Sequence, residues 1–145
     1  MLDLPVLRLD PELPLPAYAR PGDAGADLIA REGALLAARG GRAMVPAGVA
    51  VAIPEGHAGL VLPRSGLAFR HGVTVLNAPG LVDAGYRGEL NVLLVNTDPS
   101  EDYVVHRGDR IAQLVIVAFT PVAFSVVDQL PDSERGEGGF GHTGR

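Results

Sequence analysis

The sequence predicts an all-β protein, and three observations support this prediction. The 145 residues include 19 glycines and 12 prolines, which interrupt the chain too often for long helices. The apolar runs between them are short and rich in valine, as is typical of strands. Turn signals such as Pro54-Glu-Gly, Asp98-Pro and Arg107-Gly-Asp separate these runs.

The strands that these runs predict cover residues 43–45, 49–53, 58–62, 73–76, 90–96, 111–119 and 123–127. Residues 29–39 contain alanine, leucine, arginine and glutamate, which favour a helix. We expect an irregular strand there instead, because two glycines end the segment and strand-like segments surround it.

Two of the expected strands are apolar at consecutive positions instead of alternating. They contain Leu90-Asn-Val-Leu-Leu-Val and Ile111-Ala-Gln-Leu-Val-Ile-Val. Such strands are usually buried on both faces, and a small domain cannot easily cover so much apolar surface by itself. The pattern therefore predicts an oligomer.

The length is that of one domain with a substantial core, since 47% of the residues are hydrophobic. The chain shows neither a fixed-period repeat nor a long interior linker. We expect one folded domain over residues 1–131 and a flexible Gly-rich C-terminal arm over residues 132–145.

The charge and the terminal sequence argue against several classes of partner. The formal net charge of −5 gives no bulk electrostatic basis for binding nucleic acid. The chain has no cysteine, which excludes disulfides, thiolate chemistry and cysteine zinc sites. The N-terminus shows neither a signal peptide nor a membrane span. We expect a cytoplasmic protein without a membrane or nucleic-acid partner.

The last eleven residues, Arg135-Gly-Glu-Gly-Gly-Phe-Gly-His-Thr-Gly-Arg145, place five glycines around one phenylalanine. Such a tail cannot build a core and is expected to be mobile when free. It can close over a ligand, with backbone N–H groups and Arg135 on phosphate oxygens and Phe140 over a flat ring. This predicts a nucleotide lid; the alternative is a disordered, charged tail.

Pro63-Arg-Ser-Gly-Leu-Ala68 follows an apolar run and is expected to open a short helix. It presents a guanidinium, a hydroxyl and backbone N–H groups together, which suit phosphate oxygens. The alternative is a strand-end turn with a helix N-cap at Ser65.

Residues 77–89 read Asn77-Ala-Pro-Gly-Leu-Val-Asp-Ala-Gly-Tyr-Arg-Gly-Glu89 and place Asp83 and Tyr86 on an expected glycine-bent hairpin. A carboxylate at such a bend can orient and deprotonate water, and the freed backbone groups can pair with a base edge. The alternatives are a turn-forming role for Asp83 and ordinary packing for Tyr86.

Asp27 and Gln113 lie beside apolar runs, where a buried polar group needs a partner. That partner is either a phosphate or a metal-bound water, or else backbone or a neighbouring subunit. Asp109 and Arg110 are expected to form a salt bridge with each other. The histidines, at positions 57, 71, 106 and 142, show no metal-binding spacing, and we interpret the first three as surface or loop residues.

Five segments taken in order resemble the five motifs of the trimeric dUTPases. They are Ala24-Gly-Ala-Asp-Leu28, Pro63-Arg-Ser-Gly-Leu-Ala68, Gly80-Leu-Val-Asp-Ala-Gly-Tyr-Arg-Gly-Glu89, Arg107-Gly-Asp-Arg-Ile-Ala-Gln-Leu114 and Arg135-Gly-Glu-Gly-Gly-Phe-Gly-His-Thr-Gly144. The resemblance implies a homotrimer of jelly-roll-like, distorted β barrels, with active sites shared between subunits and closed by the C-terminal arm. It also implies hydrolysis of dUTP to dUMP and pyrophosphate with Mg²⁺, which limits uracil in DNA and supplies dUMP for dTMP synthesis.

The resemblance assigns a role to each matching residue. Asp83 matches the carboxylate that activates the attacking water, Tyr86 the ring packed on deoxyribose, and Asn77 and Gly80 the uracil-reading segment. The phosphate-binding positions are matched by Arg64, Ser65, Gly66 and Gln113. Asp27 matches a carboxylate that holds Mg²⁺ through water. In the arm, the matches are Arg135 for the γ-phosphate, Phe140 stacked on uracil, and Gly141 and Thr143 for further phosphate contacts.

Two positions depart from the family pattern. Ala26 stands where tyrosine or valine is often found before Asp27, which is expected to alter packing only. His142 stands where serine is common, beside the expected γ-phosphate. Because histidine titrates near neutrality, arm closure is expected to depend on pH between about 6 and 8.

Two other functions compete with this interpretation. A dCTP deaminase, or a bifunctional deaminase and diphosphatase, shares the fold but needs a catalytic glutamate, whereas Val82-Asp-Ala-Gly-Tyr86 has the dUTPase form. The other alternative is a trimeric nucleotide-binding module without activity, which would have no need of the carboxylate of Asp83.

Overall fold

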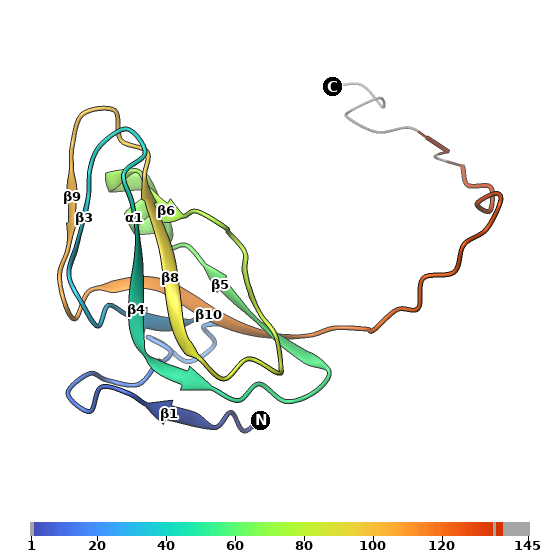
Figure 1. Cartoon of the computed structure of the whole chain (residues 1–145), viewed down its shortest axis with the longest axis horizontal. Coiled ribbons are helices and arrows are strands. Elements are labelled where there is room, and N and C mark those ends of the chain that lie inside the picture. Colours follow the sequence, from blue (N-terminus) through green and yellow to red (C-terminus); the bar gives the residue numbers. More distant parts are fainter. Residues whose placement is uncertain (1, 135, 138–145) are drawn as a thin grey trace.

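The computed structural model describes residues 2–134, 136 and 137. Almost every regular element is a strand, and all strand pairs are antiparallel. Two four-stranded sheets face each other across the core (Figure 1). The all-β prediction is therefore confirmed, and the arrangement fits a jelly-roll-like β fold.

The sheets are built from strands that lie far apart in sequence. The first sheet has the order β1 (Val6–Arg8), β4 (Arg42–Val51), β8 (Glu89–Asn96) and β6 (Val73–Val75). The second has the order β2 (Ala26–Ile29), β10 (Arg110–Ala118), β5 (His57–Leu62) and β7 (Gly80–Val82). A small third sheet pairs β3 (Ala34–Leu36) with β9 (Tyr103–Val105).

The core between the sheets consists of branched aliphatic side chains. Its most buried members are Leu28, Leu36, Leu94, Ile111, Val45, Val73, Val92 and Val105, each less than 2% exposed. Burial of such a side chain stabilises the fold by about 1.5–3 kcal/mol. Asn96, which is 0% exposed, donates its amide to the carbonyls of Leu36 and Glu101 and accepts the N–H of Asp98. This buried polar group is therefore fully bonded.

Strand β4 joins two segments that the sequence predicts as separate strands, 43–45 and 49–53. A register shift against β8 between Pro46 and Ala50 lies between them, and Gly48 has a φ of 71° there. The glycine allows the chain to pass this β-bulge without ending the strand.

The strands expected at 58–62, 73–76, 90–96 and 111–119 are confirmed within one or two residues at their ends. The irregular strand expected at 29–39 is confirmed only in part: Ile29 ends β2 and Ala34–Leu36 form β3, whereas residues 30–33 and 37–39 are not in a strand.

The strand expected at 123–127 is wrong. This segment is exposed and has no strand assignment, and after β10 the chain extends away from the sheets (Figure 1). A strand requires a neighbouring backbone for its hydrogen bonds, and among the described residues of this single chain none lies beside it.

A short helix, α1 (Ser65–His71), follows β5 as expected. Gly72 ends it in the left-handed conformation, with its N–H bonded to the carbonyls of Ala68 and Leu67. The N-cap is Arg64, without a capping side chain, so the alternative of a cap at Ser65 is wrong.

Within the described residues, no helix combines the length and the apolar character that crossing a membrane would require.

Candidate active site

Residues from β2, β10 and the end of β5 line one cavity of about 440 Å³, called here the arginine cavity. Its polar side chains include Asp27, Arg64, Arg110 and Gln113. The sheet brings them together because Gln113 on β10 pairs with Asp27 on β2 and with Leu62 on β5. Arg64 follows two residues after Leu62.

Asp27 lies between two arginines at the wall of this cavity. Its Oδ1 is 3.2 Å from Arg64 Nε, and its Oδ2 is 3.3 Å from Arg110 Nη1. Arg64 Nη1 also donates to the Arg110 carbonyl at 3.1 Å. The planar guanidinium groups of Arg64 and Arg110 present N–H donors at this wall, and such donors suit the oxygens of an anionic ligand.

Arg110 is a site residue that the sequence did not reveal. The expected salt bridge between Asp109 and Arg110 is wrong: Asp109 instead accepts the N–H of His106 at 2.8 Å and lies 3.6 Å from its ring. Strand alternation would send Arg110 and Gln113 to opposite faces. A register shift between Arg110 and Ala112 brings both to one cavity, and a bulge of this kind has no clear sequence signal.

Gly25 makes room for Gln113 in the arginine cavity. A Cβ atom at Gly25 would lie 2.4 Å from the Oε1 atom of Gln113, so any larger residue would displace that amide. Ser65 and Gly66 form the first turn of α1, directly after Arg64. They lie outside the residues that line the cavity.

A second cavity, of about 210 Å³, lies between β7 and β8 and is called here the Tyr86 cavity. It is lined by Asp83 and Tyr86, together with Leu81, Val82, Leu90 and Asn91. Asp83 and Tyr86 are both exposed. The structure therefore brings together the predicted water-activating carboxylate and the predicted sugar-binding ring.

The loop that carries these two residues is fixed by its own hydrogen bonds. Tyr86 N–H donates to the Asp83 carbonyl at 3.0 Å, and the Tyr86 hydroxyl donates to the Glu89 carbonyl at 2.9 Å. Arg87 Nη1 donates to the carbonyls of Ala84 and Tyr86 at 2.6 and 2.7 Å. A Cβ atom at Gly88 would lie 2.5 Å from the Tyr86 hydroxyl oxygen, so only glycine fits beneath the ring.

The expectation of a hairpin for this segment is wrong. β7 pairs with β5, whereas β8 pairs with β4 and β6. The loop thus crosses from one sheet to the other, since the strands on either side of it belong to different sheets. It holds Asp83 and Tyr86 at the edge of the β sandwich.

Asn77 and Gly80 lie just before this loop. Gly80 is buried and pairs with Val61 on β5. A Cβ atom at Gly80 would lie 3.4 Å from Asn77 Nδ2, so the Asn77 side chain lies close beside it. Asn77 itself is exposed in the turn after β6.

The register of β5 with β7 separates the two cavities. Val82 pairs with Gly59, so Asp83 comes just after this pair at the beginning of β5, whereas Arg64 follows the end of β5. At about 3.3 Å per residue, positions 59 and 64 lie roughly 16 Å apart along the strand. Within one chain, Asp83 and Arg64 therefore belong to different cavities.

The donors in the described chain fit a magnesium ion held mainly by a ligand's own oxygens. Among the described residues, no group of three or more histidine, cysteine, aspartate or glutamate side chains could enclose a metal. Two carboxylates line the arginine cavity, Asp27 and Asp23, and Asp23 also accepts the N–H of Arg20 at 2.9 Å. Mg²⁺ keeps several waters and commonly uses one or two carboxylates together with substrate phosphates.

Comparison with known protein families shows to which family this chain belongs. The dUTPase family model matches residues 11–144. The chain belongs to the dUTPase family. The family that the five motifs predict is therefore confirmed.

Similar dUTPases are found by sequence and by structure. The deoxyuridine 5′-triphosphate nucleotidohydrolase of Thermobifida fusca is 61% identical over 96% of this chain and 77% of that protein. That of Streptomyces avermitilis is 57% identical over 99% of this chain and 81% of that protein.

The solved structure of a mutant Staphylococcus bacteriophage 80alpha dUTPase with dUpNHpp matches with a TM-score of 0.88 and 29% identity over 100% of both chains. A dUTPase mutant from phage phi11 of S. aureus, described with a structural Mg(II) ion, matches with a TM-score of 0.82 and 26% identity over 90% of this chain and 100% of that chain.

The arm residues of the fifth dUTPase motif, Arg135, Phe140, Gly141 and Thr143, lie outside the described residues, as does His142. The predictions for these positions stay predictions.

Proposed function

We propose that this dUTP diphosphatase binds dUTP at composite sites, in which one subunit supplies its arginine cavity and another its Tyr86 cavity. The observation that supports this is the pairing of Val82, which precedes Asp83, with Gly59, a position roughly 16 Å along the strand from Arg64. Water activated by Asp83 has to reach the α-phosphorus of a triphosphate bound by Arg64. Within one chain these groups are too far apart, whereas two chains side by side can supply both.

The arginine cavity binds the triphosphate. Arg64 and Arg110 present planar guanidinium groups that suit phosphate oxygens, and Gln113 adds an amide donor. Ser65 and Gly66 add a hydroxyl and a backbone N–H from the start of α1.

Asp27 would hold a Mg²⁺ ion through a water molecule, together with the substrate phosphates. When bound, the ion supplies charge neutralisation on the triphosphate and orients it. The two arginines that pair with Asp27 hold its carboxylate at the cavity wall.

Asp83 acts as the general base. Its carboxylate takes a proton from water as the water oxygen bonds to the α-phosphorus. The bond from that phosphorus to the bridging oxygen of the β-phosphate breaks, and pyrophosphate leaves with the bonding electrons. A positioned base of this kind is typically worth about 10²–10⁴ in rate.

Selection of base and sugar takes place next to Asp83. Asn77, Gly80 and the adjoining backbone read the uracil edge. The Tyr86 ring packs on the deoxyribose and leaves no space for a 2′-hydroxyl. The arm then closes the site, with Phe140 on the uracil and Arg135, Gly141 and Thr143 on the phosphates.

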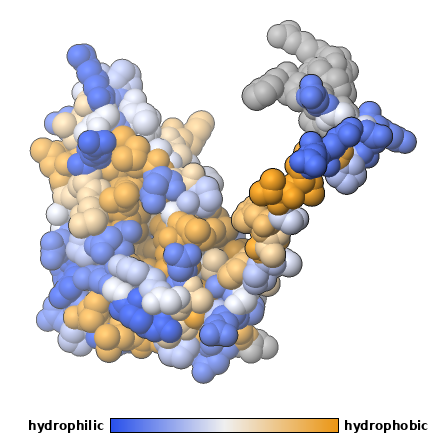
Figure 2. All heavy atoms as spheres, turned by 45° about the vertical axis from the view of Figure 1, so that its right-hand side comes forward, coloured by the Kyte–Doolittle hydropathy of each residue, from blue (hydrophilic) through white to orange (hydrophobic). Residues whose placement is uncertain are grey.

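A homotrimer supplies the second chain. Large apolar side chains remain exposed on this single chain, over the barrel and along the segment after β10 (Figure 2). In that segment the exposed fractions of Phe124 and Leu130 are 97% and 77%. Exposed apolar surface of this kind marks interaction sites, and assembly would cover it.

The reaction limits uracil incorporation into DNA and supplies dUMP for dTMP synthesis. The proposed activity is tested by measuring pyrophosphate release with Mg²⁺ from dUTP, UTP, dTTP and dCTP in separate reactions. We expect rapid release from dUTP alone. Failure to release pyrophosphate from dUTP would contradict the proposal, and ammonia release from dCTP would instead indicate the deaminase.

A further inference from the structure

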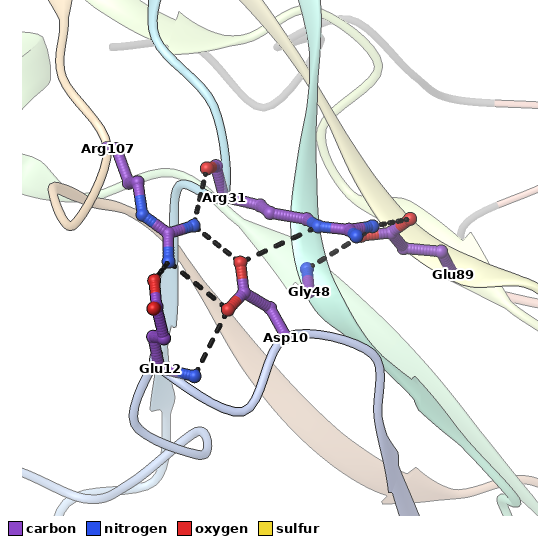
Figure 3. Close-up of polar contacts among 6 residues, drawn as sticks. All are labelled: Asp10, Glu12, Arg31, Gly48, Glu89 and Arg107. Atoms are coloured by element: carbon purple, nitrogen blue, oxygen red, sulfur yellow. Dashed lines mark hydrogen bonds and ion pairs between the residues drawn. The ribbon is translucent and has the colours of Figure 1, made fainter.

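A network of ion pairs and hydrogen bonds lies outside the two cavities (Figure 3) and includes Glu89, whose carbonyl accepts the Tyr86 hydroxyl. Its six members come from segments far apart in sequence, and they are Asp10, Glu12, Arg31, Gly48, Glu89 and Arg107. None of them lines the arginine cavity or the Tyr86 cavity. The network therefore does not contact a ligand in either cavity, and its role depends on the residues that it holds in position.

The end nearest the loop is Glu89, which binds with both its side chain and its backbone. Its carbonyl accepts the Tyr86 hydroxyl at 2.9 Å. Its Oε1 accepts the Gly48 N–H at 2.8 Å, and its Oε2 lies 3.2 Å from Arg31 Nη1. The bulge in β4 leaves the Gly48 N–H outside the regular pairing with β8, and the carboxylate bonds this donor instead. Gly48 and Arg31 therefore hold the side chain of Glu89, and the carbonyl of the same residue binds the Tyr86 hydroxyl.

Arg31 is fixed in turn by the rest of the network. Its N–H donates to the Pro46 carbonyl at 2.8 Å, and its own carbonyl accepts Arg107 Nη1 at 3.0 Å. Its Nε lies 3.7 Å from Asp10, which also binds the guanidinium of Arg107 through both carboxylate oxygens. The Arg31 and Glu89 side chains are 34% and 21% exposed, so water screens their pairing only in part.

We infer that Arg31 and Glu89 are positioning residues that hold the Tyr86 ring against the sugar, and thereby set the preference of the enzyme for dUTP over UTP. The inference rests on the proposed role of Tyr86. The hydrogen bond to Glu89 fixes one end of the ring, and Gly88 allows the chain to pass close beneath it. A ring that moves even slightly leaves space for a 2′-hydroxyl. Loss of the contacts made by Arg31 and Glu89 therefore lowers the preference for dUTP over UTP more than it lowers the rate of the reaction at Asp83.

The test compares kcat and KM for dUTP and for UTP in Glu89→Gln and Arg31→Met. We expect the ratio of kcat/KM for dUTP to that for UTP to fall about tenfold in both variants, the size of one partly buried hydrogen bond. The kcat for dUTP is expected to stay within about threefold, because Asp83 is not held by this network. Arg31→Lys should recover part of the ratio, and Arg42→Met, an exposed arginine on β4, should leave it unchanged.

A merely structural role would lower the activity on both substrates by the same factor and leave the ratio unchanged, which would overturn the inference. If Arg31→Met fails to fold, the near-isosteric Glu89→Gln decides the question. Tyr86→Phe removes the hydroxyl, so its effect on the ratio should not add to that of Glu89→Gln; additive effects would also overturn the inference.

Tyr86→Ala separates this inference from the proposed sugar-binding role of Tyr86. A ratio that changes in Tyr86→Ala but not in Glu89→Gln removes only this inference, whereas an unchanged ratio in Tyr86→Ala removes the sugar-binding role as well.

Discussion

Asp83 and Arg64 lie at opposite ends of strand β5: Val82, which precedes Asp83, pairs with Gly59, whereas Arg64 follows the final residue of the strand. The antiparallel pairing of β5 with β7 fixes this separation. Both residues are nevertheless required at one triphosphate in the proposed reaction. The proposed composite sites rest on this geometry, and so does the expected dependence of activity on assembly.

Replacement of Asp83 separates binding from chemistry. We expect Asp83→Asn to bind dUTP with near-normal affinity but to turn over at least about a hundredfold more slowly, because the amide cannot accept the proton of water. Single-turnover kinetics and equilibrium binding of dUTP measure the two quantities. Glu32→Gln, at an exposed carboxylate, is the control. Equal losses of binding and rate in Asp83→Asn would contradict the role of a base.

Arg110 is expected to contribute to phosphate binding. Removal of its guanidinium in Arg110→Ala takes one of two cations from the arginine cavity. We expect KM for dUTP to rise about tenfold, the magnitude of a lost charge-assisted hydrogen bond. Arg42→Ala removes the same charge from an exposed position on β4 and should change KM little. Equal effects in the two variants would indicate that only the net charge matters.

A pair of glycines in one loop tests the position of the Tyr86 ring. In Gly88→Ala the new Cβ would lie 2.5 Å from the Tyr86 hydroxyl oxygen, so the ring must move, whereas a Cβ at Gly85 meets nothing within 4 Å. We expect KM for dUTP to rise about tenfold in Gly88→Ala through the lost Tyr86 to Glu89 bond. In Gly85→Ala the rise should be much smaller. The prediction fails if the two variants behave alike.

The ion pair between Asp10 and Arg107 makes the folding stability of the protein depend on pH in the acidic range. The hydrogen bond from Arg107 is the main cause of a pKa of Asp10 below its ordinary value. A carboxyl whose pKa is lowered by folding stabilises the protein above its unfolded pKa of about 3.9, and this contribution is lost as the pH falls through the folded pKa. We expect Asp10→Asn to be less stable than the wild type at pH 7, with the difference shrinking below about pH 4.

Urea unfolding at one protein concentration measures this difference, because assembly of the proposed oligomer would couple stability to concentration. Asp3→Asn, at an exposed carboxylate near the N-terminus, serves as the control. A difference that stays constant down to the lowest pH would show that the charge of Asp10 is not the cause.

The main strands could be predicted from sequence because valine-rich runs and turn residues depend on local chemistry. The strand expected at 123–127 failed for the opposite reason, since a strand forms only with a neighbouring backbone. Short strands such as β1 and β9 were not expected either: each has three residues, and their pairing comes from distant segments.

The candidate site residues could be predicted from sequence motifs, whereas the way the fold brings them together could not. The sequence indicated Asp27, Arg64 and Gln113, and the arginine cavity contains all three. It gave no indication of Arg110, which a bulge redirects, or of the bond between Arg107 and Asp10, which lie 97 residues apart. Contacts at such separation depend on sheet register, which single-residue propensities do not encode.

Complementation between two inactive variants tests the composite site most directly. Arg64→Ala lacks a phosphate-binding group and Asp83→Asn lacks the base, so each alone should be nearly inactive. If sites are shared between subunits, refolding the two together combines an intact Asp83 with an intact Arg64 in about a quarter of the sites of a randomly assembled cyclic oligomer. We predict that dUTP hydrolysis returns toward that level. Activity that stays at the sum of the two separate variants would show that each chain builds its own site, and would contradict the account.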